Sequence, residues 1–234
     1  MSDNSTPRDR ILARIRSGLG ASANDGARRA TVESRLAAHK PHLVPERADK
    51  SGAALKSLFR EFLEGQSATV VEVDGSDAVP SAIAQYLRAS NLPQRVRVGE
   101  DRYLAQLPWT KEPGLERRRG RASADDEVGL SHAVSAVAET GTLVLASGPA
   151  NPVTLTYLPE THIVVVKAGD IVGPYETAFE RARSIFGSGV MPRTLNLVSG
   201  PSRTADVGGR LVMGAHGPRR LCVIIVNEPA GGGP

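Results

Sequence analysis

Short apolar runs of strand length recur through the second half of the chain. Valine, leucine and isoleucine dominate these runs, which cover residues 135–138, 142–146, 162–166, 195–198 and 221–226. Such short, uniformly apolar runs are typical of strands that are buried on both faces of a mainly parallel sheet. The first two runs are separated only by residues 139–141, which are too few for a crossover, so we expect some antiparallel pairing there.

Helical spacing alternates with strand-like patterns in the rest of the chain. The expected elements, in chain order, are a helix at residues 55–65, a strand at 68–73, a helix capped by Ser76 that carries Ile83 and Leu87, a strand at 95–98, a short helix at 103–107 and a helix at 175–186. This alternation predicts an α/β fold. We expect a mixed, mostly parallel sheet with helices on both faces.

The first residues predict a basic amphipathic helix. Thr6 and Pro7 suit its first turn, and Ile11 and Ile15 follow at helical spacing among several arginines. Residues 21–30 are small and polar, and we expect them to separate this helix from the body of the protein. We interpret the helix as an arm that packs on the domain or on another subunit. A nucleic-acid-binding arm is less favoured, because no aromatic residue accompanies the arginines.

The chain is expected to have three parts. These are a basic helical arm and linker at residues 1–50, a main domain at 51–228 and a frayed tail at 229–234. Residues 109–127 interrupt the main domain with a block of arginines followed by a block of acidic residues. We interpret this segment as a solvated excursion whose opposite charges neutralise each other; a basic patch that faces an anionic ligand is the alternative.

Composition excludes several classes of protein. The formal charge of +4 is too small to indicate a nucleic-acid-binding protein without a concentrated patch. The single cysteine, Cys222, excludes an internal disulfide and a cluster held by several thiolates of this chain. The amino terminus has no apolar run after its charges, and no apolar stretch approaches the ~20 residues of a membrane helix. We therefore expect a cytoplasmic protein without a membrane span.

Glu139 is the first candidate for chemistry. It lies between two apolar runs and beside Thr140, Gly141 and Thr142, which we include as candidate ligand-binding residues. A carboxylate so close to buried strands requires a partner or a function. One interpretation is that it accepts backbone amides at a tight turn, and the other is that it acts in catalysis or binding.

Two loops rich in glycine and hydroxyl groups follow predicted strands. Their candidate ligand-binding residues are Ser147, Gly148 and Asn151 in the first loop, and Ser199, Gly200, Ser202, Arg203, Thr204 and Asp206 in the second. Backbone amides of such loops can approach an anion, and ligands of open α/β sheets bind beyond the carboxyl ends of the strands. We expect the two loops to meet over one edge of the sheet. Arg203 suits a carboxylate or phosphate, although an ion pair with Asp206 would equally explain it.

His216, framed by glycines just before the last strand, is a further candidate ligand contact, although a turn role is equally compatible with the sequence. The other histidines have no spacing typical of metal ligands, so we predict no bound metal. Cys222 lies in an apolar run and is interpreted as a core residue. The phosphate-loop, dinucleotide-binding and serine-hydrolase motifs are absent from the sequence.

Several motifs together resemble the lactate-utilization protein C family, whose members consist largely of a LUD domain. The motifs are AETGTLVLASGP, the apolar run around His162, SGPSRTADV and the later HGP. The resemblance is strongest from about residue 128 to residue 227. It implies the fold shared by coenzyme A transferases, ribose-phosphate isomerases and glucosamine-phosphate deaminases.

The resemblance also implies a role in oxidising L-lactate to pyruvate together with two iron–sulfur cluster proteins. The clusters would belong to these partners, because the chain has too few thiolates to hold one. Its own contribution has two interpretations: an enzyme-like subunit that binds a small anionic or nucleotide-like ligand, or an assembly subunit without catalysis. A sugar-phosphate isomerase or coenzyme A transferase-like enzyme on the same fold is a third.

Overall fold

The computed structural model describes residues 6–20, 25–40, 43–204 and 212–227. The chain divides into two compact units, Met1–Leu43 and Val44–Pro234. In the first unit, Thr6 and Asp9 form a reciprocal capping box at the start of helix α1 (Pro7–Gly18), which confirms the predicted cap. A second helix, α2 (Gly26–Ala38), begins after its cap Asp25. Residues 26–30 of the expected separator therefore belong to this second helix.

The second unit begins before the predicted boundary at residue 50. Ala48 is only 2% exposed, and its carbonyl oxygen lies so close to Gly173 that a Cβ atom there would be 2.2 Å from it. Arg47 also pairs with Glu139 at 3.3 Å. These contacts attach the segment that precedes residue 50 to the main domain. The predicted tail at residues 229–234 lies outside the described residues.

Within the described residues, six strands form one sheet in which every neighbouring pair is parallel. In spatial order they are β1 (Thr69–Val73), β12 (Arg220–Val226), β7 (Thr161–Lys167), β4 (Val128–His132), β2 (Arg95–Val98) and β3 (Glu116–Arg119). The central strands β12 and β7 are buried almost throughout. This explains the uniformly apolar sequence that predicted them.

A second, mixed sheet of four strands contains the short connection at Glu139. Its order is β8 (Ile171–Val172), β5 (Ser135–Val137), β6 (Thr142–Ala146) and β9 (Leu195–Val198). β6 is antiparallel to both β5 and β9, whereas β5 and β8 are parallel. The predicted antiparallel pairing is thus confirmed. A separate small ribbon pairs β10 (Arg203–Thr204) with β11 (Val212–Met213).

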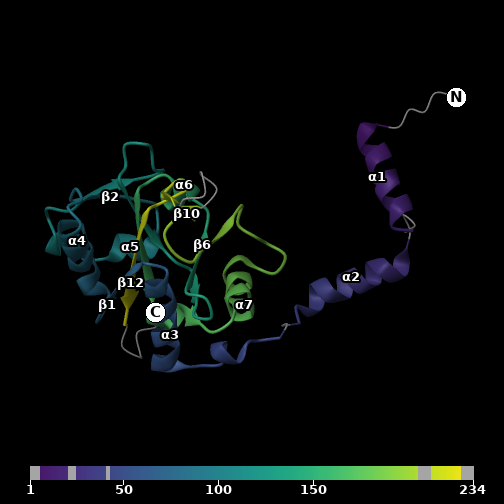
Figure 1. The fold of residues 1–234 in the computed structure, drawn as a ribbon, viewed down its shortest axis with the longest axis horizontal. Helices are drawn as coiled ribbons and strands as arrows, with labels where there is room; N and C mark the ends of the chain where they lie inside the picture. The colour runs from purple at the N-terminus through teal and green to yellow at the C-terminus, as the bar shows by residue number, and fades with distance from the viewer. Residues whose placement is uncertain (1–5, 21–24, 41–42, 205–211, 228–234) are drawn as a thin grey trace. The chain divides into compact units, whose positions relative to one another are not determined.

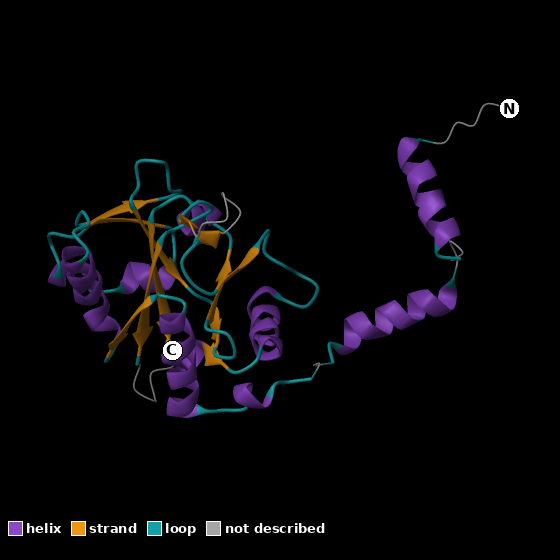
Figure 2. Cartoon of the chain, in the orientation of Figure 1, coloured by secondary structure: helices purple, strands orange, loops and turns teal. Residues whose placement is uncertain are grey.

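Helices and sheets form successive layers in the second unit (Figure 1). The helices are α3 (Gly52–Gly65), α4 (Val79–Ala89), α5 (Arg102–Gln106), α6 (Val153–Tyr157) and α7 (Tyr175–Phe186). Helices α4 and α5 pack on one face of the main sheet, and α3 together with the second sheet packs on the other. Helix α7 covers the outer face of the second sheet. Figure 2 shows the strands between these helices, which confirms the α/β class.

One local prediction was wrong, and two strands were not predicted. Ser76 does not cap a helix; it begins a 3-10 turn (Ser76–Ala78), and α4 starts at Val79 without a side-chain cap. The polar segment that we interpreted as a solvated excursion contains β3, whose residues are all exposed at the edge of the sheet. Strand β4 was not predicted as a separate element. Among the described residues, no helix is long and apolar enough to cross a membrane.

Candidate functional site

A pocket of about 720 Å³ lies at the carboxyl ends of β2, β3 and β6. Its lining residues are Glu100, Gly120, Arg121, Ser147, Gly148, Pro149, Pro152, Val153, Thr154, Arg193 and Thr194. β2 and β3 are parallel, so the segments that follow them leave at the same edge of the main sheet. This is the edge at which open α/β sheets bind their ligands.

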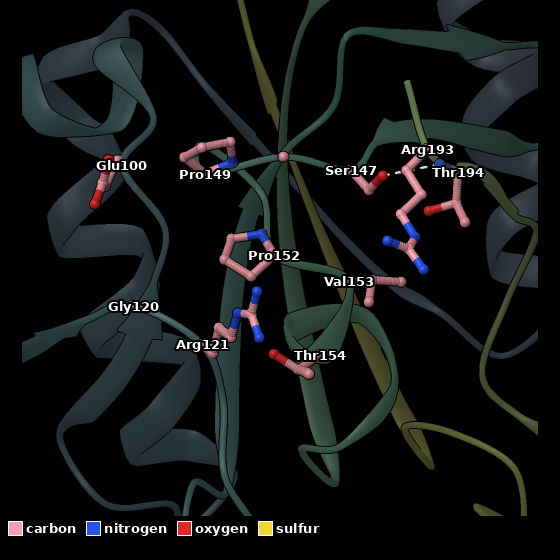
Figure 3. A pocket seen from close by; sticks show the side chains of 11 residues that line it. Glu100, Gly120, Arg121, Ser147, Pro149, Pro152, Val153, Thr154, Arg193 and Thr194 are labelled. Atoms are coloured by element: carbon pink, nitrogen blue, oxygen red, sulfur yellow. Dashed lines mark hydrogen bonds between the residues drawn. The ribbon is translucent and has the colours of Figure 1, made fainter. Parts of the chain in front are cut away.

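Two arginines make the pocket electropositive. In Figure 3 the guanidinium groups of Arg121 and Arg193 extend toward Pro152 and Val153, while Glu100 lies apart from both. Neither guanidinium group forms an ion pair with another residue in the described part of the chain. Planar guanidinium groups bind carboxylate and phosphate groups through paired hydrogen bonds. The pocket is therefore suited to an anion.

Hydrogen bonds hold both arginine-bearing segments in place. The amide of Ala122 donates to Thr154 Oγ1 at 2.9 Å and thereby joins the residue after Arg121 to α6. The amide of Thr194 donates to Ser147 Oγ at 2.9 Å, and the amide of Ser147 donates to the carbonyl of Thr194 at 3.0 Å. Ser147 thus anchors the residue after Arg193 (Figure 3).

The loop after β6 does not present its amides as we predicted. The amides of Gly148 and Asn151 each donate to the carbonyl group of the other at 3.2 Å, and the Ser147 amide is bonded to Thr194. These donors are consequently occupied within the protein. In this pocket the arginine side chains, rather than a row of free backbone amides, supply the attraction for an anion.

A histidine–aspartate pair lies at the same carboxyl edge, at the ends of β4 and β2. The Nδ1 atom of His132 is 3.4 Å from the Oδ2 atom of Asp101. Tyr103 stacks on the imidazole ring with centroids 4.6 Å apart. The Lys167 ammonium group lies 4.5 Å from the centroid of the Tyr103 ring.

Partial burial would raise the pKa of Asp101. The hydrogen bond and charge of His132, and the amides of Leu104 and Tyr103, outweigh this effect and lower the pKa below its ordinary value of 3.8. Asp101 is therefore ionised at neutral pH and can orient the imidazole ring of His132.

The family assignment follows from a comparison with known protein families. The family model for the LUD domain matches residues 39–226, which is most of the chain. The chain belongs to the LUD domain family.

Curated relatives of this LUD domain share about a third of the matched residues. Lactate utilization protein C of Shouchella clausii is 32% identical over 102 residues, which are 44% of each chain. Lactate utilization protein C of Bacillus subtilis is 32% identical over 121 residues, or 51% of this chain and 50% of the relative. The LUD domain protein thus spans about half the length of the curated relatives that it matches.

A crystal structure has the same fold. A DUF162 family protein from Deinococcus radiodurans superposes with a TM-score of 0.58 and 25% sequence identity, covering 76% of this chain and 99% of that protein. The shared fold supports the assignment of α/β architecture to the LUD domain.

The two predicted loops do not build one pocket. β6 and β9 are antiparallel, so the residues after β6 and those after β9 leave at opposite ends of the strand pair. Ser147 accordingly bonds to Thr194, whereas Ser199 bonds to Thr142 at 2.7 Å. Ser147 and Gly148 line the pocket of the LUD domain, and the described residues of the second loop do not. The expectation that both loops meet over one edge is therefore wrong.

Glu139 lies in the turn between β5 and β6. Its carboxylate is held by Arg47, and its amide donates to the carbonyl of Gly173 at 3.2 Å. The adjacent hydroxyl groups form a cluster in which Thr140, Thr142 and Tyr175 lie 2.7 to 2.9 Å apart. This turn does not line the pocket, and a catalytic role for Glu139 remains a prediction.

The remaining predicted residues attach the second loop to its surroundings. A Cβ atom on Gly200 would lie 2.9 Å from the Cβ atom of Gln66, and the Arg203 guanidinium group donates to the Gln66 carbonyl at the end of α3. Ser202 Oγ accepts a 3.3 Å hydrogen bond from the amide of His216, whose side chain is exposed. Thr204 pairs with Val212 in the small ribbon. Asp206 lies outside the described residues.

Arg193 and the histidine–aspartate pair were missed as site residues, and Arg121 was included only in the alternative of a basic patch that faces an anionic ligand. Arg121 directly follows the exposed strand β3, whose charged sequence does not have the apolar pattern of a strand. His132 ends β4, a strand that the apolar runs of the sequence did not predict. Recognising these two strands would have placed both side chains at a carboxyl edge.

Proposed function

We propose that this LUD domain protein acts as a lactate-utilization protein C in the system that oxidises L-lactate to pyruvate. In this system it would be a component that carries no iron–sulfur cluster of its own. The similarity to relatives of that name over about half the chain supports this role. The single cysteine is consistent with it, because iron–sulfur clusters need several thiolates that partner proteins would supply. Two iron–sulfur proteins are the proposed partners, and the proposed location is the cytoplasm.

The single observation that carries a ligand-binding role is the basic pocket at the carboxyl edge. Its volume of about 720 Å³ falls in the range of about 300–1,000 Å³ that is typical of sites for medium-sized ligands. A three-carbon acid would fill only a small part of it. We therefore propose an anionic, nucleotide-like ligand whose phosphate groups are bound by Arg121 and Arg193.

Isothermal titration with coenzyme A, ADP and L-lactate tests the pocket. We expect saturable binding of a phosphate-bearing ligand, weakened about tenfold or more by Arg121→Ala or Arg193→Ala, because a charge-assisted hydrogen bond contributes about 1.5–3 kcal/mol. Arg183→Ala in α7 is the matched control, since Arg183 does not line the pocket. Absence of binding by all three compounds, or equal losses in the control, would contradict the ligand role.

The system-level role needs a separate measurement. Deleting the protein should abolish growth on L-lactate while growth on pyruvate continues, and an affinity-tagged chain should co-purify with proteins that contain iron–sulfur clusters. Normal growth of the deletion strain on L-lactate would overturn the proposed function. Co-purification without ligand binding would instead favour an assembly subunit.

A further inference from the structure

The Asp101–His132 pair has a polar atom without a partner. Although the side chain of His132 is 15% exposed, its Nε2 atom is buried and has no hydrogen-bond partner among the described residues. With Nδ1 facing the Asp101 carboxylate, a neutral imidazole donates from Nδ1 and leaves Nε2 as an acceptor. A buried acceptor that is left unsatisfied costs about 1–3 kcal/mol. A ligand that donates a hydrogen bond would remove this cost.

A second buried side chain without partners lies in a loop that contacts the same segment. Asn151 is 5% exposed, and neither its Oδ1 nor its Nδ2 atom has a hydrogen-bond partner among the described residues. Its loop packs on the two residues that precede Asp101. The amide of Glu100 donates to the carbonyl of Pro149 at 2.9 Å, and a Cβ atom on Gly99 would lie 2.1 Å from the carbonyl oxygen of Ala150.

The rest of the cluster supplies charge and rigidity. Tyr103 is stacked on the imidazole ring, which restricts the orientation of His132. Lys167 brings a positive charge to the carboxyl end of β7, which is the neighbour of β4 in the sheet. One edge of the sheet thus combines a hydrogen-bond acceptor that is fixed by a carboxylate with the positive charge of Lys167, whose ammonium group also lies over the Tyr103 ring.

We propose that this cluster is a second binding site of the protein, which takes a small hydroxy acid. The ligand hydroxyl donates a hydrogen bond to His132 Nε2, and the carboxylate of the ligand is attracted by Lys167. Asp101 is a positioning residue that holds the imidazole in the acceptor tautomer. The choice of a hydroxy acid rests on the proposed function, whereas the existence of the site rests on the cluster itself.

Nuclear magnetic resonance of the histidine side chains in the full-length protein tests this site. L-lactate should shift the ring nitrogen signals of His132 saturably. Propionate, which lacks the hydroxyl group, should bind about tenfold more weakly, since a typical hydrogen bond contributes about 1 kcal/mol and one to a buried acceptor contributes more. His216, which is exposed, is the internal control and should not respond. The signal of His132 is identified by its loss in the His132→Gln variant.

Two variants divide the roles within the cluster. Lys167→Met should weaken the binding of L-lactate and of propionate alike, about tenfold, because both ligands carry the carboxylate that Lys167 attracts. Asp101→Asn should change the tautomer of His132, which the ring nitrogen shifts report. It should also weaken the binding of L-lactate more than the binding of propionate. A merely structural Asp101 would leave the tautomer unchanged, which would overturn its positioning role.

Failure of this site can be told apart from failure of the proposed function. If L-lactate leaves the His132 signals unmoved, or if propionate binds as tightly as L-lactate, the hydroxy-acid site does not exist. Binding of coenzyme A or ADP at Arg121 and Arg193, and the growth phenotype on L-lactate, are measured on the same protein and would then stand unaffected.

Discussion

The imidazole of His162 is buried in the middle of the main sheet, where its Nε2 atom lies 2.9 Å from Ser131 Oγ. Desolvation lowers the pKa of His162 to about 3, so the ring is neutral in the folded protein. In the unfolded chain the same ring takes up a proton near pH 6.5. The unfolded state therefore binds more protons between these two values.

We predict that the protein loses stability through His162 as the pH falls below 6.5. The loss is up to about 1.4 kcal/mol per pH unit and continues until the ring is protonated in the folded protein as well. Urea unfolding of the protein and of His162→Gln between pH 7 and pH 4 measures it. The free energy of unfolding should depend less steeply on pH in the glutamine variant than in the unchanged protein, whatever the absolute stability of the variant. Equal slopes would mean that the folded protein already accepts a proton at His162.

At the scale of elements, the tight turn between β5 and β6 depends on Gly141. Its φ angle of 64° lies in the left-handed region, and a Cβ atom there would be 2.7 Å from the Cβ atom of Phe62 and 2.9 Å from the amide nitrogen of Leu63. The turn can therefore approach α3 only because residue 141 has no side chain.

Gly141→Ala should lower the free energy of unfolding by about 2 kcal/mol or more, since the substitution combines backbone strain with a steric clash. Gly114→Ala is the matched control, because no heavy atom lies within 4 Å of the Cβ position there. The control should change stability by less than about 0.5 kcal/mol, as is usual for surface positions. Chemical denaturation of both variants decides the matter, and comparable stabilities would show that the turn can relax.

At the scale of the whole molecule, the chain divides into two compact units between Leu43 and Val44, and the stability of the second unit should not depend on the first. Helices α1 and α2 bury no residue, whereas Ala48 and Arg47 contact the main domain. A chain that starts at Val44 should unfold in one transition with a free energy within about 0.5 kcal/mol of the full-length value.

A chain that starts at residue 51 should be less stable than the one that starts at Val44, by about 1–3 kcal/mol, because the contacts of Ala48 and Arg47 are lost. Thermal and urea unfolding of the two truncated proteins compares the observed boundary with the one that the sequence predicted. Identical stabilities would show that residues 44–50 contribute nothing to the main domain.

The sequence alone determined those elements whose pattern is set by local burial. Buried strands such as β7 and β12 are apolar throughout, because they are covered on both faces, and the capping box at Thr6 is a contact within one turn. The exposed edge strand β3 has no such signal. It is held as a strand by its pairing with β2, a contact that no local pattern encodes.

Only the tertiary structure decided where the candidate chemistry lies. Ser147 and Ser199 follow two strands with similar sequence patterns, but the antiparallel pairing of β6 with β9 sends them to opposite ends. Conversely, Asp101 and His132 are far apart in the sequence and meet because β2 and β4 are parallel neighbours. Strand direction and strand order arise from long-range pairing. For that reason the sequence identified the α/β class and the family likeness, whereas the tertiary structure decided the division of the strands between two sheets and the places of the site residues.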